Sequence, residues 1–289
     1  TVTDASGTED QPIALNITAA STDADGSESV SVTISNIPDG AVLTDGSGNP
    51  ITITDGSAEL TTAQLEGLTI TPPENSDEDF TLNVAVTTTD GDDTATVTGE
   101  LDVSVAADAD APTLDLTDTA SGDEDTAIAL NISSALTDTD GSESLSITIS
   151  DVPDGAVLSA GTNNNDGTWT LSPDQLDGLT ITPPEDFAGT FDLAVTATST
   201  EADGGDTAQT LGSISVDVAA VADDADMTVT DASGTEDQPI ALNITAASTD
   251  ADGSESVSVT ISNIPDGAVL TDGSGNPITI TDGSAELTT

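Results

Sequence analysis

The 289-residue chain contains 55 Asp and Glu residues and no Lys, Arg or His, so its formal net charge is -55. Nucleic acids and the anionic face of membranes are bound through Lys and Arg, and neither kind of partner is expected here. His, Cys, Lys and Tyr are all absent, so triad bases, thiolates and amine nucleophiles are missing. A pair of glycosidase carboxylates could still form, but the three Phe and one Trp leave few aromatic side chains on which a sugar could stack. We therefore expect no enzyme.

Apolar and polar residues alternate in the first part of the chain, at 13–17, 30–34, 67–71, 80–86 and 101–105. Period-two alternation is typical of strands with one buried face, so a strand is expected at each place. PDG and TPP turn signals separate the strands, and TTAQL from Thr61 predicts one helical turn. The alternation favours a folded chain, although the content of large apolar residues is close to that of disordered proteins.

The following part of the chain is a diverged copy of the first. Strands are expected at 128–132, 145–149, 178–182, 191–195 and 214–218, and SPDQL from Ser172 predicts a second helical turn. An S-G-x-E-D motif begins at Ser6, Ser121 and Ser233, which are 115 and then 112 residues apart. Each repeat therefore has the size of one β-sandwich domain.

A third copy closes the sequence, because residues 228–289 repeat residues 1–62 letter for letter. This copy stops before the equivalents of the strands that begin at Leu68. We expect it to be completed by residues of a neighbouring chain or to have unpaired strand edges, as a window cut from a longer array would. The predicted domains are residues 1–110, residues 111–226 and the truncated copy 227–289.

Seven or so short strands per repeat predict an all-β fold of tandem immunoglobulin-like Greek-key β-sandwiches in an extended rod; a closed barrel is the alternative. Without Cys or Lys, neither disulfides nor Lys-Asn isopeptide bonds can brace these domains, which leaves metal ions. No apolar run reaches the length of a membrane span, so no membrane insertion is expected in this segment.

Each repeat carries one D-x-D-G-S-E string, which begins at Asp23, Asp138 and Asp250. Alternate carboxylates followed by a Gly turn can surround a hard cation with oxygen ligands. An EF-hand is excluded, because its twelfth position falls on Ile34 and Ile149 instead of Glu. The alternative is a solvated Asp-Gly turn, but the chain has no cationic side chain to offset the clustered charges.

Strand order places the acidic residues of each repeat at its two ends. The loop after the first strand, the loop before the sixth strand and the exit of the last strand meet at one end, and the D-x-D-G loop of the next repeat faces them. Opposed carboxylates would repel each other unless divalent ions bridged them. The candidate calcium ligands are Glu9, Asp10, Asp23, Asp25, Asp77, Asp79, Asp108, Asp110, Glu124, Asp125, Asp138, Asp140, Glu185, Asp186, Asp224, Asp226, Glu236, Asp237, Asp250 and Asp252.

Acids in the loop before the last strand, including Asp90 and Glu201, are a separate group. They could complete the site at the D-x-D-G end or hold a weaker ion of their own, and the sequence does not decide between the two.

These motifs together resemble the tandem repeats of giant RTX adhesins of Gram-negative bacteria, which are cadherin-like in their ion placement. The motifs are the E-D pair at Glu9, D-x-D-G, T-P-P-E at Thr71 and the linker ADADAP. The resemblance implies calcium between neighbouring repeats and an extracellular, bacterial cell-surface extender that projects a terminal binding domain in biofilm attachment. The chain departs from the pattern in its second linker, ADDADMT, and lacks tandem G-G-x-G-x-D nonapeptides.

Three functions are therefore weighed: a calcium-stiffened extender, a module that itself binds a polysaccharide or a like domain, and a subunit of a surface sheath with contacts between like chains. Identical copies almost free of aromatic residues favour the extender, whose selected property is length. Solubility in brine would also explain the charge, but it would scatter the carboxylates instead of grouping them at domain ends.

Overall fold

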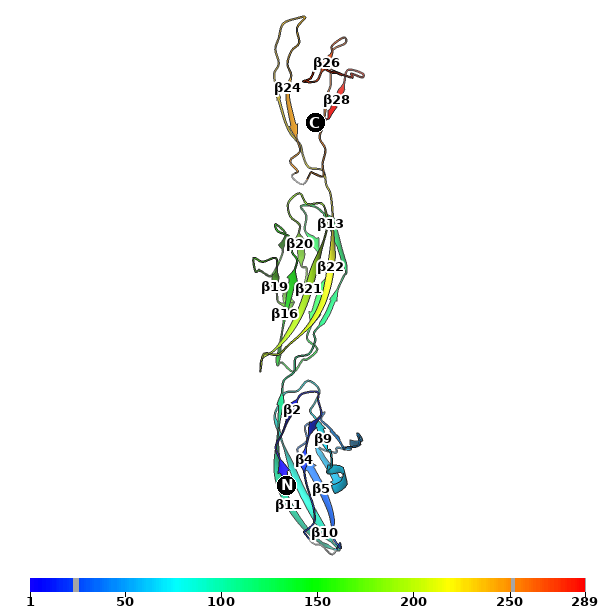
Figure 1. Ribbon diagram of the computed structural model, residues 1–289, viewed down its shortest axis with the longest axis vertical. Helices are drawn as coiled ribbons and strands as arrows, with labels where there is room; N and C mark the ends of the chain where they lie inside the picture. The colour runs from blue at the N-terminus through cyan, green and yellow to red at the C-terminus, as the bar shows by residue number, and fades with distance from the viewer. Residues whose placement is uncertain (23–25, 251–252, 289) are drawn as a thin grey trace. The chain divides into compact units, whose positions relative to one another are not determined.

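The computed structural model describes residues 1–22, 26–250 and 253–288 (Figure 1). β-Strands make up nearly all of its regular structure, and two single 3-10 turns complete it within the described residues. The expectation of an all-β fold is confirmed. Among the described residues, no helix is long and apolar enough to cross a membrane.

The first sandwich contains a five-stranded sheet in the order β2-β11-β10-β5-β8. Its strands are β2 (Ala5–Thr8), β5 (Ser29–Ser35), β8 (Ser57–Thr61), β10 (Phe80–Asp90) and β11 (Asp93–Ala106). The central strand β10 is antiparallel to β5 and β11. In contrast, β2 is parallel to β11, with Ala5 opposite Val103 and Thr8 opposite Ala106. The strands expected over 30–34, 80–86 and 101–105 are all present in this sheet.

Shorter strands form the facing sheet, in the order β3-β9-β6-β7, and β1 pairs with β4. They are β1 (Val2–Thr3), β3 (Ile13–Ala14), β4 (Asn16–Ile17), β6 (Val42–Thr44), β7 (Pro50–Ile51) and β9 (Thr69–Thr71). The single strand expected over 13–17 is divided at Leu15, where the chain changes partner: Ile13 pairs with Ile70, whereas Asn16 pairs with Thr3. The helical turn expected after Thr61 is η1 (Thr62–Leu65).

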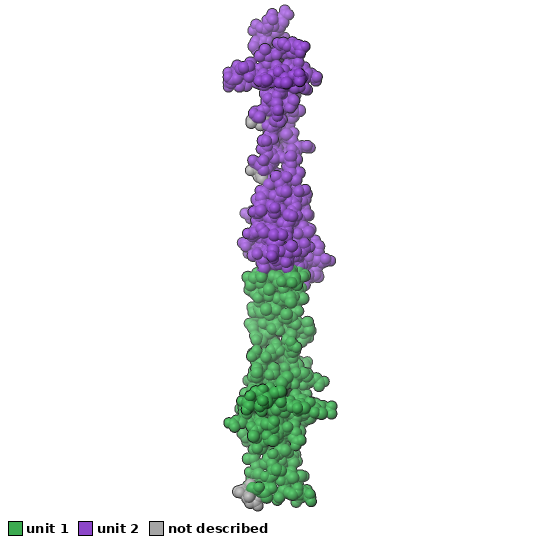
Figure 2. Space-filling model, turned by 90° about the vertical axis from the view of Figure 1, so that its right-hand side faces the viewer, with its two compact units in different colours: residues 1–115, 133–148, 196–211 green, residues 116–132, 149–195, 212–289 purple. Residues whose placement is uncertain are grey.

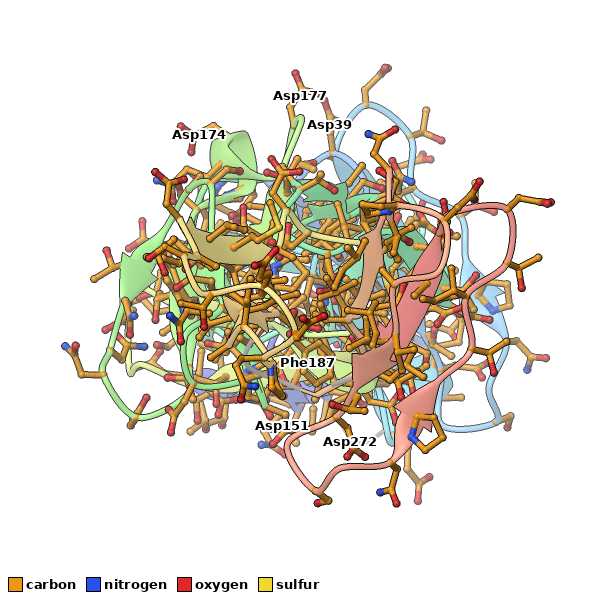
Figure 3. The ribbon with its side chains drawn as sticks, turned by 90° about the horizontal axis from the view of Figure 1, so that it is seen from above. Asp39, Asp151, Asp174, Asp177, Phe187 and Asp272 are labelled. Atoms are coloured by element: carbon orange, nitrogen blue, oxygen red, sulfur yellow. The ribbon has the colours of Figure 1, made fainter. Side chains whose placement is uncertain are left out.

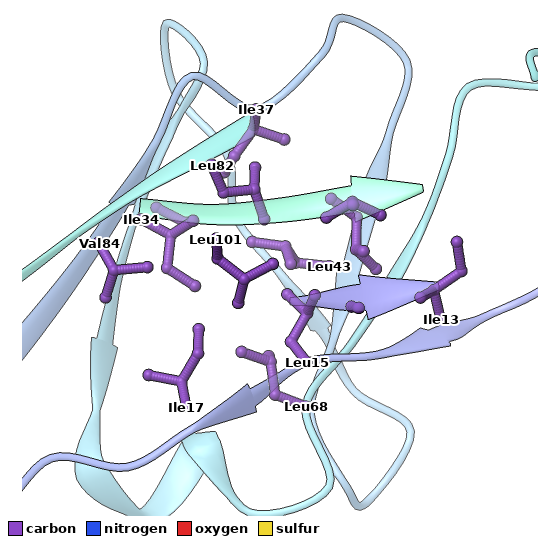
Figure 4. Packing of buried hydrophobic residues seen from close by; sticks show 14 of the residues in the cluster. Ile13, Leu15, Ile17, Ile34, Ile37, Leu43, Leu68, Leu82, Val84 and Leu101 are labelled. Carbon is purple, nitrogen blue, oxygen red and sulfur yellow. The ribbon is translucent and has the colours of Figure 1, made fainter. Parts of the chain in front are cut away.

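The two sheets share one aliphatic core, which makes this part of the chain a β-sandwich (Figure 4). The larger sheet contributes alternate residues of β5, β10 and β11, and the smaller sheet contributes residues around β3, β6 and β9. Fully or almost fully buried members include Val32, Ile34, Leu82, Val84, Leu101, Val103, Ile13, Leu15, Leu43, Leu68 and Ile70. The period-two pattern of apolar residues therefore identifies which face of each strand is buried.

The second repeat has the same architecture, with a six-stranded sheet in the order β13-β22-β21-β16-β19-β18 and a three-stranded sheet in the order β14-β20-β17. Strands β12 and β15 pair separately. The bounds are β12 (Thr113–Leu116), β13 (Thr119–Asp123), β14 (Ile128–Ala129), β15 (Ile132–Ala135), β16 (Glu143–Ser150), β17 (Val157–Leu158), β18 (Thr162–Asn163), β19 (Trp169–Leu171), β20 (Thr180–Thr182), β21 (Gly189–Glu201) and β22 (Thr207–Ala219). The helical turn expected at SPDQL is η2 (Pro173–Gln175).

Residues 228–289 do not form a closed sandwich within their described part. They contribute to three separate two-stranded sheets, β23-β24, β25-β28 and β26-β27. The bounds are β23 (Asp226–Thr230), β24 (Asn243–Ala247), β25 (Ser258–Ile261), β26 (Leu270–Thr271), β27 (Pro277–Ile278) and β28 (Ala285–Thr288). Ile240 is 47% exposed, whereas Ile13 in the identical first copy is 2% exposed. Completion of this copy by residues of a neighbouring chain stays a prediction.

Two compact units can be distinguished by their internal contacts (Figure 2). One unit comprises residues 1–115, 133–148 and 196–211, and the other comprises residues 116–132, 149–195 and 212–289. Strands β16, β21 and β22 contribute residues to both units. The domain boundaries after residues 110 and 226 stay predictions.

Replacing Gly46 with Ala is expected to destabilise the first sandwich by about 1–3 kcal/mol, the usual cost of overpacking. An added Cβ would overlap the carbonyl oxygen of Glu66, which is backbone and cannot turn away. Gly273, the same residue of the third copy, has open space around it, so Gly273→Ala is the matched control and should change little. Urea unfolding followed by far-ultraviolet circular dichroism measures both variants, and equal losses would contradict the packing of η1 against this turn.

Candidate metal centre

Carboxylates in this chain are of two kinds, exposed and buried. Most lie on loops and project into solvent, as Asp39, Asp174 and Asp177 do (Figure 3). Five others are at most 9% exposed: Glu9, Glu124, Asp138, Glu143 and Glu201. A buried carboxylate is costly unless it is paired, and no cationic side chain exists to pair it. The buried acids therefore mark the place where a functional site is to be sought.

The buried glutamates occupy inward-facing positions at strand ends. Glu201 ends β21 in phase with the buried residues Val195, Ala197 and Ser199, and Glu143 begins β16 in phase with Ile147. Successive inward positions on a strand are two residues apart, so each carboxylate continues the row of core side chains beyond the core. The folding of the strands thus fixes where these acids lie.

Glu9 continues β2 by one more backbone hydrogen bond, from its N–H to the carbonyl oxygen of Ala106 at 3.0 Å. Its Oε1 accepts the N–H of Asp108 at 2.7 Å, while its Oε2 is buried without a hydrogen-bond partner. Burial raises the pKa of Glu9 to about 7, and the negative charges of Asp138 and Glu201 add to the effect. One oxygen of Glu9 is therefore held by the linker and the other is available.

Asp138 lies in the D-x-D-G loop of the second repeat, whereas Glu143 begins β16 and Glu201 ends β21. Asp138 is held by the N–H of Asp140 at 2.8 Å and the hydroxyl of Ser142 at 3.1 Å. Glu143 Oε1 accepts the N–H of Asp110 at 2.7 Å, and its Oε2 lacks a partner. Both oxygens of Glu201 are buried without a partner.

We refer to Glu9, Asp110, Asp138, Glu143 and Glu201 as the first acidic cluster; all five lie in one compact unit. One oxygen each of Glu9, Asp138 and Glu201 lie within 4.8 Å of one another. Burial raises the pKa values of Asp110, Glu143 and Glu201, with further contributions from neighbouring carboxylates in each case. A group of buried carboxylate oxygens without cationic partners fits a hard divalent ion, which takes carboxylate oxygen ligands.

A second acidic cluster lies within the other unit, with Glu124, Asp125, Asp186, Asp223 and Glu255 as its members. Glu124 Oε1 accepts the N–H of Val221 and Glu255 Oε1 accepts that of Asp223, both at 2.6 Å. Glu124 Oε2 is buried without a partner. One oxygen each of Asp125, Asp186 and Asp223 lie within 4.8 Å of one another. This cluster is more exposed than the first.

Several predicted ligands have structural contacts around the clusters. Asp10, at a φ of 54°, accepts the N–H of Asn75 at 3.0 Å, and Asp125 accepts that of Asp186 at 3.1 Å. Asp79 accepts the N–H of Val105 at 2.8 Å. These bonds connect the loops that surround each cluster.

The remaining predicted ligands are placed as follows. Asp77 is half-buried; Asp108, Asp140, Glu185, Asp224 and Asp226 are exposed. In the third copy Glu236 and Asp237 are exposed and Asp250 is half-buried. Asp23, Asp25 and Asp252 lie outside the described residues. In the second linker, Asp223 has the position that Asp110 has in the first, because each donates its N–H to the last glutamate of a D-x-D-G-S-E string.

The list of predicted ligands omits Glu143, Glu201, Asp223 and Glu255, which the structure brings into the clusters. Glu201 was one of the acids that the sequence offered for completing the D-x-D-G site, and one of its oxygens lies within 4.8 Å of an oxygen of Asp138. The alternation of β16 and β21 carried a signal for two of them, since counting back from Ile147 or forward from Val195 in steps of two reaches Glu143 and Glu201.

No protein-family model and no curated protein matches the chain. Among solved structures, it is similar to Drosophila N-cadherin EC1-3, at 16% identity and a TM-score of 0.25 over 76% of this chain and 65% of that one. It is similar to the titin domains z1z2, at 10% identity and a TM-score of 0.27 over 76% of this chain and 94% of that one. An endo-fucoidan hydrolase of glycoside hydrolase family 107 matches at 16% identity and a TM-score of 0.20, over 66% of this chain and 24% of that one.

Proposed function

We propose that the chain is a calcium-stiffened extender in the stalk of an extracellular bacterial adhesin. One observation carries the proposal: Glu9 Oε2, Glu143 Oε2 and both oxygens of Glu201 are buried without hydrogen-bond partners in a chain with no cationic side chain. An ion at this cluster would supply the positive charge that these oxygens need. For the same reason, we propose a second ion site at the second acidic cluster, beside the following linker.

The chemistry of the ligands favours calcium over magnesium. Calcium accepts six to eight oxygen ligands in flexible geometry, whereas magnesium requires near-octahedral geometry and keeps several waters. The cluster offers carboxylates from strand ends, a loop and a linker, which is a crowded and irregular oxygen environment. Millimolar calcium is found outside cells, where modules of this kind bind at about 10⁻⁴–10⁻³ M. An extracellular, bacterial cell-surface location is therefore part of the proposal.

The proposed role is mechanical and not catalytic. Each cluster would join the strand ends of one repeat to the loops of the next, so an ion there would suppress bending at the linker. The neighbouring repeats are then the chain's own partners. The terminal binding domain, the biofilm context and the relation to RTX adhesins enter this proposal from the sequence resemblance alone.

Small-angle scattering tests the proposal. In millimolar calcium the chain is expected to behave as a rod in which each complete repeat adds roughly 40 Å, from strands of about eight residues plus loops. Replacing Asp108, Asp110, Asp138 and Asp140 with Asn should shorten the maximum dimension in calcium towards the value found with chelator, because the joint becomes flexible while both cores stay folded.

The control removes the same charge from exposed loops, by replacing Asp39, Asp154, Asp174 and Asp177 with Asn. This variant should keep the dimension of the parent chain. A maximum dimension that is the same with calcium and with chelator would contradict the extender proposal.

A further inference from the structure

The linker that follows the first sandwich is held through its main chain. Glu9 holds its incoming end: the N–H of Glu9 donates to the carbonyl oxygen of Ala106 at 3.0 Å, and Glu9 Oε1 accepts the N–H of Asp108 at 2.7 Å. Because Glu9 directly continues β2, the peptide group that joins Ala107 to Asp108 is fixed to the first sandwich.

The outgoing end of the same linker is held by the second repeat. Glu143 Oε1 accepts the N–H of Asp110 at 2.7 Å. Three hydroxyl groups then donate to three successive carbonyl oxygens of the linker: Ser199 to Asp110, Thr137 to Ala111 at 3.0 Å, and Thr210 to Pro112 at 2.6 Å. From the N–H of Asp110 onward, the linker is therefore fixed to the second repeat without the help of an ion.

Only a short stretch of main chain lies between the two held peptide groups. The first group ends at the nitrogen of Asp108, and the second begins at the carbonyl carbon of Ala109. Peptide bonds are planar and do not rotate freely. The torsion angles left between the two groups are therefore φ and ψ of Asp108 and φ and ψ of Ala109.

The second linker, in the other compact unit, has the same arrangement although its sequence differs. Glu124 binds the carbonyl oxygen of Ala219 at 3.0 Å and the N–H of Val221 at 2.6 Å, Glu255 binds the N–H of Asp223 at 2.6 Å, and Thr249 binds the carbonyl oxygen of Asp224 at 2.8 Å. The residues between the held peptide groups are here Val221 and Ala222.

We propose that each joint between repeats bends at a pivot of two residues, Asp108 with Ala109 in the first linker and Val221 with Ala222 in the second. Glu9 and Glu143 are positioning residues of the first pivot: one oxygen of each holds one side of it, and the other oxygen lacks a hydrogen-bond partner. An ion at the first acidic cluster would tie the two sides together. The pivot needs no ion, whereas its arrest by calcium rests on the proposed function.

Distances between two spin labels, measured by pulsed electron paramagnetic resonance, test the first pivot. The chain has no Cys, so Ser104→Cys and Leu211→Cys, at exposed positions of β11 and β22, supply the labelling sites. In chelator, Ala109→Gly should broaden the distance distribution by at least about 1.5-fold, because Gly also populates positive φ.

Ala111→Gly is the matched control and should leave the width unchanged, since the peptide groups on both sides of Ala111 are held by Ser199 and Thr137. In a chain that also carries Thr137→Val, Ala111→Gly should broaden the distribution, because the carbonyl group of Ala111 is then released. In calcium, the distribution of the Ala109→Gly variant should narrow to that of the parent chain.

Three results in chelator would overturn the pivot: an unchanged width for Ala109→Gly, an equal broadening by Ala111→Gly, or no effect of Ala111→Gly in the Thr137→Val chain. If the widths in chelator follow the expectation and calcium changes none of them, the pivot stands and the extender proposal fails. The two proposals can therefore be told apart.

Discussion

Millimolar calcium is expected to raise the melting temperature of the chain by up to about 10 °C over the same buffer with chelator. At dissociation constants of about 10⁻⁴–10⁻³ M, an ion that binds only the folded state stabilises it by about 0.4–1.4 kcal/mol per site at about 1 mM. For a domain of about 100 residues, 1 kcal/mol corresponds to roughly 4–8 °C. Thermal unfolding followed by circular dichroism measures the shift, and resistance to proteolysis should increase with it.

Sodium at matched ionic strength is the first control, because a rise as large as that in calcium would show that screening alone explains the effect. Glu201→Gln is the second. In chelator this variant should be more stable than the parent chain, since it removes one of several packed negative charges. In calcium it should be less stable than the parent chain, since a ligand is lost. Glu78→Gln, at an exposed position, should change neither condition.

Without calcium, the stability of the chain is expected to fall as pH rises from about 5 to about 8. Burial raises the pKa of Glu9 from 4.5 to about 7, so the folded chain holds a proton there that the unfolded chain has already released. The stabilisation that this proton provides is fully present below the pKa of the unfolded chain, 4.5, and is lost as pH rises through the pKa of the folded chain, about 7. A shift of this size corresponds to about 3 kcal/mol.

Urea midpoints at the two pH values, measured with chelator, test this expectation. Glu9→Gln should flatten the pH dependence, and Glu78→Gln should leave most of it in place. In calcium the dependence should be weaker, because an ion binds the ionised carboxylates and replaces the protons. Stability in chelator that increases with pH would contradict the buried position of Glu9.

The strands were predictable because both repeats keep strict alternation where they bury one face. The stretches around Ile34 and Leu82 became long strands with the expected inward residues. The interruption at Leu15 was not predictable, since a strand that changes partner keeps its alternation while its hydrogen bonds move to another neighbour.

The candidate site was predictable in part. The motifs led to Glu9 and Asp138, because an acidic pair and a D-x-D-G loop are local patterns. Glu201 belongs to the acids before the last strand, for which the sequence left two sites open, and its burial depends on where β21 ends relative to the linker, which is a property of the folded repeat. Asp223 was missed for a related reason: the second linker differs in sequence from ADADAP, so its hydrogen-bonded position could be identified only from its bond to Glu255.

Residues 228–289 mark the limit of local reasoning. Ile240 has the same neighbours in sequence as Ile13, and any prediction from a window around it would give the same buried strand. Burial of Ile13 depends on residues about 60–90 positions further along the first repeat, such as Ile70 and Val103, which lie in the same core.

The parallel pairing of β2 with β11 has a consequence for pulling forces. These strands lie near the two chain ends of the first sandwich, and their hydrogen bonds run from the Ala5–Val103 pair to the Thr8–Ala106 pair. Tension applied through the chain ends draws the two strands past each other along their length, so these bonds are sheared together instead of being opened one after another. In the second repeat, β13 and β22 are parallel from the Thr119–Ser215 pair to the Asp123–Ala219 pair. Each complete repeat therefore resists stretching at the strands by which the chain enters and leaves it.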